Sequence, residues 1–392
     1  MRQISLAILV LVGTEAVMAN SAISFAMRKL AFSTNQLGLD VYRGAGDSRN
    51  LAICPFCISS SLAAILLGAT GNSALALRQA LYLWGLRPHE VHAAYRDLAR
   101  HLRDHLQAQQ THEPGETSRK TDATLPDKII TYEGMYVQRT VSIHYPYLFY
   151  LRRFYNATVH PLDFVLFAEE SRQHINAVAE RQTEGTISHL LDVTPSSATN
   201  FLVLSALFMR GSLDVESVAR VRYVQDSYLN CTAVEVPLRG GLLSLLTLQP
   251  LDPSGPLDLL ETRLSAQRLS DILNSMEIRR AALKIPQIKM EFSYGNLSRT
   301  LYHLGLSDLF TPGYAGLFGV SDFGWFHVTN ITHRARLDLR SPVEEGPGEL
   351  NTEDDEEILQ DLTQPFLFFV MDNIAGLAVA MGRIFPNSTF SL

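Results

Sequence analysis

One apolar run near the middle of the chain limits the fold more than any other feature. Residues 201–209, from Phe201 to Met209, are almost entirely apolar, with Ser205 in their midst. A strand of this kind is buried on both faces, so it must lie inside a large sheet that carries other structure on either side. The stretch from Ile129 to Val137 is rich in β-branched and aromatic residues and predicts another strand.

Helical patterns precede and follow these strands. Apolar residues at helical spacing predict amphipathic helices around Leu62–Ala69 and over residues 89–106, and residues 175–191 also predict a helix. Near the C-terminus, two apolar runs, 366–371 and 377–381, flank the turn residues 372–376, as in a β-hairpin. We therefore expect an α+β fold with large sheets.

The N-terminus predicts export. Arg2 precedes an apolar run from Ile4 to Val12, and small residues around Ala19 suit a signal peptidase. We expect a signal peptide over residues 1–19 and a single domain over residues 20–392, secreted to the extracellular space. Five Asn-x-Ser/Thr sequons predict a glycoprotein. They begin at Asn156, Asn230, Asn296, Asn330 and Asn387.

Charge and motifs exclude several function classes. The net charge of −7 gives no basic surface for nucleic acid. No later apolar segment is long enough to span a membrane. The arginines of residues 89–106 are diluted by Asp97 and Asp104, so we do not expect a heparin-like glycan to bind there. Motifs of hydrolases, zinc proteases and phosphate-binding loops are absent, so we expect no enzyme, no cofactor and no metal.

Several segments, taken in order along the chain, resemble the serpin family. Residues 50–72 are similar to the serpin segment that leads from a buried strand into a core helix, and residues 201–211 resemble its central strand. Further similar segments include Lys284-Ile-Pro286, residues 301–310, Gln364-Pro-Phe-Leu-Phe368 and Met381-Gly-Arg383. The resemblance implies a monomer with three β-sheets, eight or nine helices and an exposed reactive loop at about residues 344–363. Between Gly211 and Val221 the chain is a few dozen residues shorter than the family pattern, so we expect some strands of the two smaller sheets to be missing.

The hinge of this reactive loop departs from the pattern of inhibitory serpins. In those relatives the cut loop inserts into the main sheet as a new strand and carries the acylated protease with it. Glu344, Glu345 and Gly346 resemble the start of the hinge, but the next residues include Pro347 and Glu349 instead of small residues. Proline cannot donate a ladder hydrogen bond, and a buried unpaired carboxylate costs several kcal/mol. We therefore expect a poor or non-inhibitory serpin that acts as a binding, carrier or precursor protein. The alternative is an inhibitor of an extracellular serine endopeptidase that works by loop cleavage and insertion.

The position of the scissile bond stays open. Counting from the hinge places it near Gln360, and counting back from Pro365 places it near Asp354. No lysine or arginine lies between Arg340 and Arg383, which excludes a trypsin-like protease. Ile358 or Leu359 would suit an extracellular serine protease that prefers apolar residues.

The resemblance also indicates a sheet-opening region formed by Cys54, Cys57, Ser205 and His333. Serpins usually have serines at the two cysteine positions and an asparagine at Ser205, so the hydrogen-bond network there is altered. The Cys54-x-x-Cys57 spacing is also found in redox proteins, but buried positions favour unreactive thiols. A local disulfide between these two cysteines, which would leave Cys231 unpaired, remains an alternative.

Overall fold

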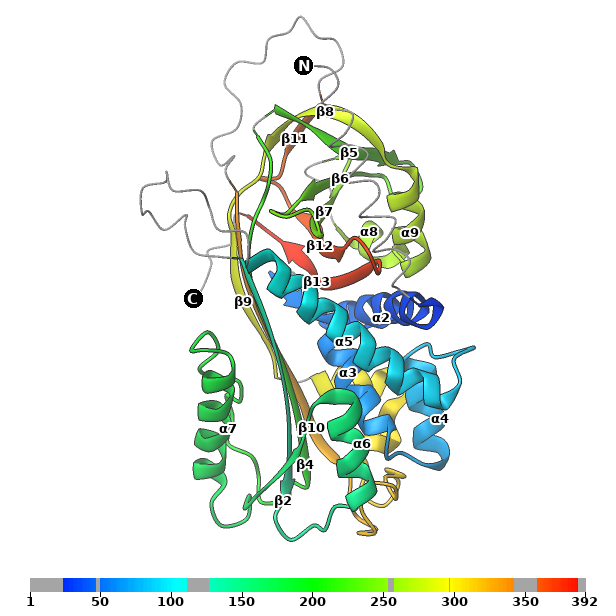
Figure 1. Ribbon diagram of the computed structural model, residues 1–392, viewed down its shortest axis with the longest axis vertical. Helices are drawn as coiled ribbons and strands as arrows, with labels where there is room; N and C mark the ends of the chain where they lie inside the picture. Colours follow the sequence, from blue (N-terminus) through cyan, green and yellow to red (C-terminus); the bar gives the residue numbers. More distant parts are fainter. Residues whose placement is uncertain are drawn as a thin grey trace, which may run out of the picture.

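The computed structural model describes residues 24–46, 50–110, 127–216, 218–252, 257–295, 297–341 and 358–386. The molecule is elongated, with one sheet and its helices at one end and a second sheet at the other (Figure 1). The helices are α2 (Phe25–Gly44), α3 (Pro55–Leu66), α4 (Gly71–Ala80), α5 (Pro88–Gln110), α6 (Tyr145–Tyr155), α7 (Ala168–Gln182), α8 (Asp258–Arg263), α9 (Ala266–Ser275) and α10 (Leu297–Leu301), followed by the short turns η2 (Tyr302–Leu306) and η3 (Ser307–Phe310).

The strands fall into two sheets in the described part of the chain. The five-stranded sheet has the order β3 (Val159–Leu162), β2 (Lys128–Gln138), β4 (Phe201–Ser212), β10 (Val328–Arg340), β9 (Ile288–Tyr294). The eight-stranded sheet has the order β1 (Leu51–Ile53), β13 (Leu377–Ile384), β12 (Phe366–Asp372), β7 (Leu243–Pro250), β6 (Cys231–Pro237), β5 (Val218–Asp226), β8 (Glu277–Lys284), β11 (Ile358–Asp361).

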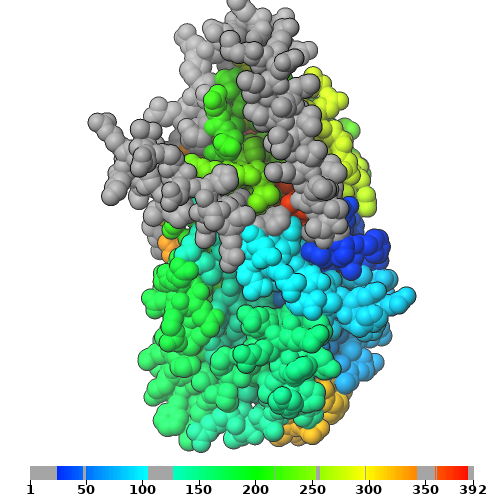
Figure 2. All heavy atoms as spheres, viewed as in Figure 1, coloured from blue at the N-terminus to red at the C-terminus, as the bar shows by residue number. Residues whose placement is uncertain are grey.

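The apolar run at residues 201–209 is the central strand β4, as predicted, and both of its faces are covered. Its side chains alternate because successive residues of a strand point to opposite faces. One set, Leu202, Leu204, Ala206 and Phe208, packs in the cluster that includes α7. The other set, Phe201, Val203, Leu207 and Met209, joins the main core with α3. Figure 1 shows α7 on one side of the sheet and α6 on the other, and Figure 2 shows the outer surface of this half of the molecule.

The described part of the chain has two sheets where three were expected. The single strand β5 pairs antiparallel with β6 along one edge and with β8 along the other. The two smaller sheets of the serpin pattern are thereby joined into one. That strands are missing stays a prediction. Within β5, Arg222 and Tyr223 pair on both edges, whereas residues 218–221 pair only with β8 and residues 224–226 only with β6.

One predicted helix differs in extent from the helix in the structure. The helix expected over residues 175–191 is α7, which ends at Gln182. Glu184 and Gly185 adopt positive φ of 53° and 76°, which no helix can continue through. The Thr183 hydroxyl donates to the carbonyl of Ala179 (2.8 Å) and accepts from the Ile187 amide (3.1 Å), which fixes the turn.

The predicted hairpin is formed by β12 and β13, with Gly376 at φ 70° in its turn. Among the described residues, no helix is long and apolar enough to cross a membrane.

Candidate functional site: the seam between β4 and β10

The two central strands of the five-stranded sheet lie side by side along their whole length. β4 and β10 pair in parallel from Phe201 with Val328 to Ser212 with Arg340. They are far apart in sequence, and a new strand that entered the sheet centre would have to separate them. This seam is therefore the place where an inserting loop would act.

His333 and Ser205 face each other across the seam, as the sequence comparison with serpins predicted. Ser205 Oγ and His333 Nδ1 are 2.9 Å apart, and the backbone amide of Cys54 donates to His333 Nε2 (2.9 Å). Because Nε2 accepts, the ring proton of the neutral imidazole is on Nδ1 and is donated to Ser205. The side chain of His333 is fully buried, and burial lowers its pKa to about 3. The network therefore operates with an uncharged histidine.

Cys54 and Cys57 are joined by a disulfide at the start of α3. Cys54 is the N-cap residue, and its Sγ accepts from the Cys57 amide at 3.0 Å. Both residues are buried. Of the two states that the sequence left open, the structure has the disulfide instead of the favoured free thiols. Cys231 is free and buried, and burial raises its pKa to about 12, which keeps it protonated.

A second set of contacts lies one residue further along β10, and sequence reasoning missed it. Arg334 donates to both carboxylate oxygens of Asp192 (2.6 and 2.7 Å) and to Glu291 Oε1 on β9 (2.8 Å). Ser293 Oγ also donates to Asp192 (2.9 Å), and Arg336 Nη1 donates to the carbonyl of Thr186 (2.9 Å). These bonds tie the loop after α7 to β9 and β10. Two arginines within one strand, Arg334 and Arg336, were the only sequence signal for them.

The ends of the reactive loop are well defined, although the loop itself is not described. β10 ends at Arg340, and β11 begins at Ile358. The predicted hinge residues Glu344, Glu345, Gly346, Pro347 and Glu349 lie outside the described residues, as does Asp354.

The predicted loop range of 344–363 is too long at its C-terminal end. Ile358, Leu359 and Gln360 belong to β11, which pairs in parallel with Ala281 to Leu283 of β8. Gln360 is buried, and its Nε2 donates to Gln249 Oε1 at 2.5 Å. These three residues were predicted as scissile candidates in an exposed loop, but the structure places them in a strand at the edge of the sheet, with Gln360 buried.

Comparison with known families decides the identity of the fold. The family described as Serpin (serine protease inhibitor) matches residues 32–217 and 215–386. The chain belongs to the serpin family. Its sequence is 26% identical to Serpin B10 of Homo sapiens and 25% identical to leukocyte elastase inhibitor A of Mus musculus, each over 91% of this chain and 99% of the relative.

Solved serpin structures have the same fold. Maspin matches with a TM-score of 0.77 at 17% identity, covering 92% of this serpin and 99% of maspin. Uncleaved ovalbumin matches with a TM-score of 0.74 at 22% identity, covering 91% and 99%. The predicted serpin fold is confirmed, and membership in a family of protease inhibitors and non-inhibitory relatives confirms that the protein is not an enzyme.

The prediction of a secreted, extracellular protein is wrong. The relatives Serpin B10 and leukocyte elastase inhibitor are intracellular serpins of clade B that lack secretion signals, and this finding overturns the prediction. The apolar run at residues 4–12 suggested a signal peptide by composition, and residues 1–23 lie outside the described part.

The predicted glycosylation sites have different environments. Asn156 and Asn230 are exposed and adopt positive φ of 52°, at the end of α6 and in the turn before β6. Asn330 is half-buried on β10, and its Oδ1 accepts from Ser298 Oγ at 2.7 Å. Asn296 and Asn387 lie outside the described residues.

Proposed function

We propose that this serpin is a poor or non-inhibitory member of its family that acts as a binding, carrier or precursor protein. The observation that carries the proposal is a mismatch between the seam and the loop. The β4 side of the seam is 12 residues long. The chain that would fill it lies between Arg340 and Ile358, which leaves residues 341–357.

Insertion uses part of this length before any new pairing forms. The chain must first reverse direction after β10, and tight reversals take about two to five residues. About 13 residues then remain before β11. A protease also has to hold several residues on both sides of the bond it cuts, so the bond must lie some residues before Ile358. The cut segment is then too short to fill the seam, and an incompletely inserted strand would not carry the protease to the far end of the sheet.

The composition of the hinge also opposes insertion. If Gly346 aligns with the family hinge, Pro347 and Glu349 are among the first residues that would enter the sheet. Proline leaves one ladder hydrogen bond unmade, and each carboxylate that turns toward the core loses its hydration without gaining a cation. Because trapping is a race between insertion and hydrolysis of the acyl enzyme, slow insertion favours hydrolysis and release.

A second candidate function is inhibition of a serine protease that prefers apolar residues. The family description and the name of the leukocyte elastase inhibitor relatives favour it. The loop offers no lysine or arginine, which leaves apolar and acidic residues as sites for attack.

One experiment separates the two functions. The full-length protein is mixed with an elastase-like and a chymotrypsin-like protease, and the products are separated on denaturing gels. We expect cleavage within residues 341–357 without a covalent complex. A stable covalent complex in the unmodified protein would instead establish the inhibitor.

A matched variant tests the reason for the result. Replacing Pro347 with Thr, and Glu349, Asn351 and Glu353 with Ala, supplies the small residues that insertion needs. We expect this hinge variant to be cleaved at the same bond and to show more insertion than the wild type. If the hinge variant is cleaved at the same bond but inserts no more than the wild type, hinge composition is not what prevents insertion.

A further inference from the structure

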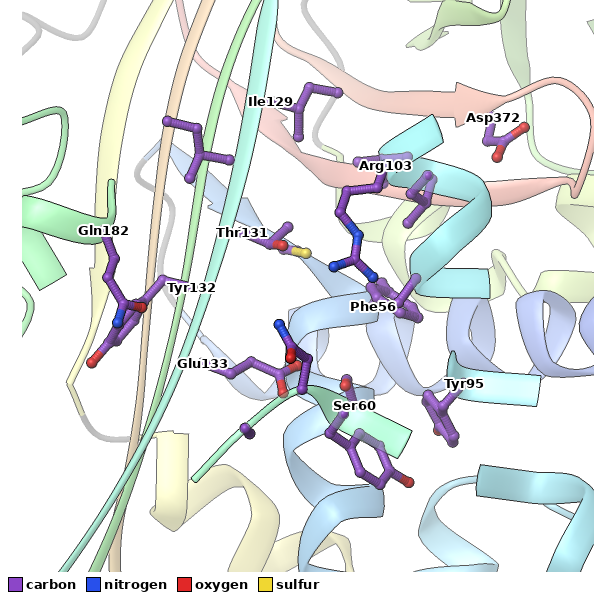
Figure 3. Close-up of a pocket in the computed structure, with 18 of the residues that line it drawn as sticks. Phe56, Ser60, Tyr95, Arg103, Ile129, Thr131, Tyr132, Glu133, Gln182 and Asp372 are labelled. Atoms are coloured by element: carbon purple, nitrogen blue, oxygen red, sulfur yellow. The ribbon is translucent and has the colours of Figure 1, made fainter. Parts of the chain in front are cut away.

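A cavity of about 340 Å³ lies between β2 and the helices α3, α5 and α6. This volume is within the range of small-molecule sites in proteins. Aromatic rings of Phe56, Tyr95, Phe154 and Tyr155 line it, together with polar groups. Figure 3 shows Glu133 reaching into the cavity from β2 and Arg103 reaching into it from α5.

Glu133 has little inside the protein to balance its charge. Its neighbour Tyr132 packs on the α7 side of the sheet, so Glu133 points to the opposite side, toward α3. Its only partner among the described residues is the hydroxyl of Ser60, and no described lysine, arginine or histidine forms an ion pair with it. Burial raises the pKa of Glu133 to about 7 despite the Ser60 hydrogen bond.

Arg103 is the cation of the cavity, and within the described part of the chain it also has no ion pair. The other two arginines on α5 behave differently, because Arg96 and Arg100 contact Asp97 at 2.8 and 3.7 Å. Figure 3 shows the Arg103 guanidinium directed toward the cavity.

Three other polar residues on the walls, Tyr95, Tyr155 and Asp372, already have partners inside the protein. Tyr95 Oη is 2.5 Å from Ser59 Oγ, and Tyr155 Oη is 2.6 Å from His92 Nδ1. Asp372 Oδ2 is 2.7 Å from His101 Nε2. The carboxyl of Glu133 and the guanidinium of Arg103 are therefore the charged groups available to a ligand, one of each sign.

We propose that this cavity binds a small zwitterion with an aromatic body, of the aromatic amino acid class, with its ammonium group at Glu133 and its carboxylate at Arg103. The ring lies against the aromatic walls, where stacking and burial of apolar surface contribute to binding. The ligand ammonium supplies a cation that the described residues do not give Glu133, and the ligand carboxylate meets the exposed Arg103, so both protein charges are paired in the complex. A ligand with only one charge would leave the other protein group unpaired.

Three probes that share one ring test the assignment by calorimetry on the full-length protein. L-phenylalanine carries both charges, phenethylamine carries only the amine, and 3-phenylpropionate carries only the acid. We expect L-phenylalanine to bind at least about tenfold more tightly than either of the others, the effect of about 1.4 kcal/mol per unmatched pair. Absence of binding by all three probes at millimolar concentration overturns the proposal, as does equal binding of all three.

Two substitutions assign the roles. Glu133→Gln should weaken L-phenylalanine and phenethylamine about tenfold and leave 3-phenylpropionate unchanged, because the amide keeps the shape but cannot carry the charge. Arg103→Gln should weaken L-phenylalanine and 3-phenylpropionate and leave phenethylamine unchanged. Glu180→Gln on the exposed side of α7 and Arg100→Gln on α5 are the matched controls. If Glu133→Gln or Arg103→Gln binds all probes like its control, the site is not the one proposed.

The pH dependence gives an independent readout. Because the ammonium group pairs with the ionised carboxylate, L-phenylalanine affinity should fall about tenfold per pH unit below pH 7 and level off above it. The other titratable groups on the walls are Tyr95, Tyr132, Tyr155, Arg103 and Asp372, with His92 and His101 directly behind them. In Glu133→Gln these groups remain, so its profile should be flat between pH 6 and 8. A sloped profile in that variant would assign the effect to one of the other groups and contradict the role of Glu133.

Discussion

His333 on β10 lies opposite Ser205 on β4, with its Nδ1 2.9 Å from the serine Oγ. The same ring accepts the backbone amide of Cys54 through Nε2. One uncharged side chain thus connects both strands of the seam to the start of α3. Any event that separates β4 from β10 must break this connection or carry it along with one strand.

Removal of the His333 ring should destabilise the protein. His333→Ala leaves the Cys54 amide and the Ser205 hydroxyl buried without this partner, which costs about 1–3 kcal/mol for each unsatisfied group. We expect a lower free energy of unfolding in urea. Ser293→Ala, on the exposed edge of the sheet, serves as the comparison and should lose less than His333→Ala. Equal losses would mean that the seam network does not contribute to stability.

The stability of the protein should depend on the charge state of His333 in a defined pH window. The folded-state pKa of about 3 lies below the usual 6.5, so the unfolded chain binds more protons between these values. The contribution of the neutral ring is fully present above pH 6.5 and is lost as the pH falls toward 3. His333→Gln supplies one donor and one acceptor, as the neutral imidazole does, but does not titrate. The unfolding free energy of the wild type should therefore decrease relative to that of this variant as the pH falls from 6.5 to 3.

Glu133 should produce the opposite pH dependence. Its folded-state pKa of about 7 lies above the usual 4.5, so the folded protein binds the additional proton between these values. Relative to Glu133→Gln, the wild type should lose stability as the pH rises from 4.5 to 7. Urea unfolding of both proteins at several pH values measures this loss. A difference in unfolding free energy that does not change with pH would show that the Glu133 carboxyl is not desolvated.

Alkylation and mass spectrometry can check the disulfide. In the denatured but unreduced protein, only Cys231 should react with iodoacetamide, whereas all three cysteines should react after reduction. In the folded protein, Cys231 should react slowly because it is buried and its pKa is raised to about 12, and the thiolate is the reactive form. Three alkyl groups on the denatured, unreduced protein would mean that Cys54 and Cys57 are free thiols.

Arg334 should contribute more to the stability of the protein than an exposed arginine that also pairs with a carboxylate. Its side chain is 11% exposed and bonds two carboxylates, whereas Arg279 is 46% exposed and bonds Glu277. Arg334→Ala removes the cation that Asp192 and Glu291 share, and because these carboxylates are partly exposed we expect a loss of about 1–2 kcal/mol in unfolding free energy. Arg279→Ala should cost less than about 1 kcal/mol. If the two variants unfold at the same urea concentration, the Arg334 contacts do not stabilise the sheet.

Loop cleavage should change the melting temperature only slightly. Full insertion of a loop adds a central strand and raises thermal stability, and we expect the wild type to gain little after cleavage because its cut segment is short and acidic. The hinge variant described above should gain more. A large increase in the melting temperature of the cleaved wild type would contradict the proposed function.

The sequence predicted those parts of the molecule that depend on local pattern. The strand β4 follows from its continuous apolar run, and the hairpin of β12 and β13 and the helix α5 follow from the spacing of apolar residues. The meeting of Ser205 with His333 was predicted only through the resemblance to serpins, because no local pattern links positions 128 residues apart.

The remaining features depend on contacts between distant segments. Predicting them requires knowing which strands and helices become neighbours. These features are the pairing of β5 with both β6 and β8, the burial of Gln360 in β11, the contacts of Arg334 with Asp192 and Glu291, and the cavity with Glu133 and Arg103. By itself the sequence determined which segments are strands and helices and which faces are apolar, because these depend on residue spacing along the chain. Only the tertiary structure decided which charges are left without a partner inside the protein, because pairing depends on distances that the folded chain alone sets.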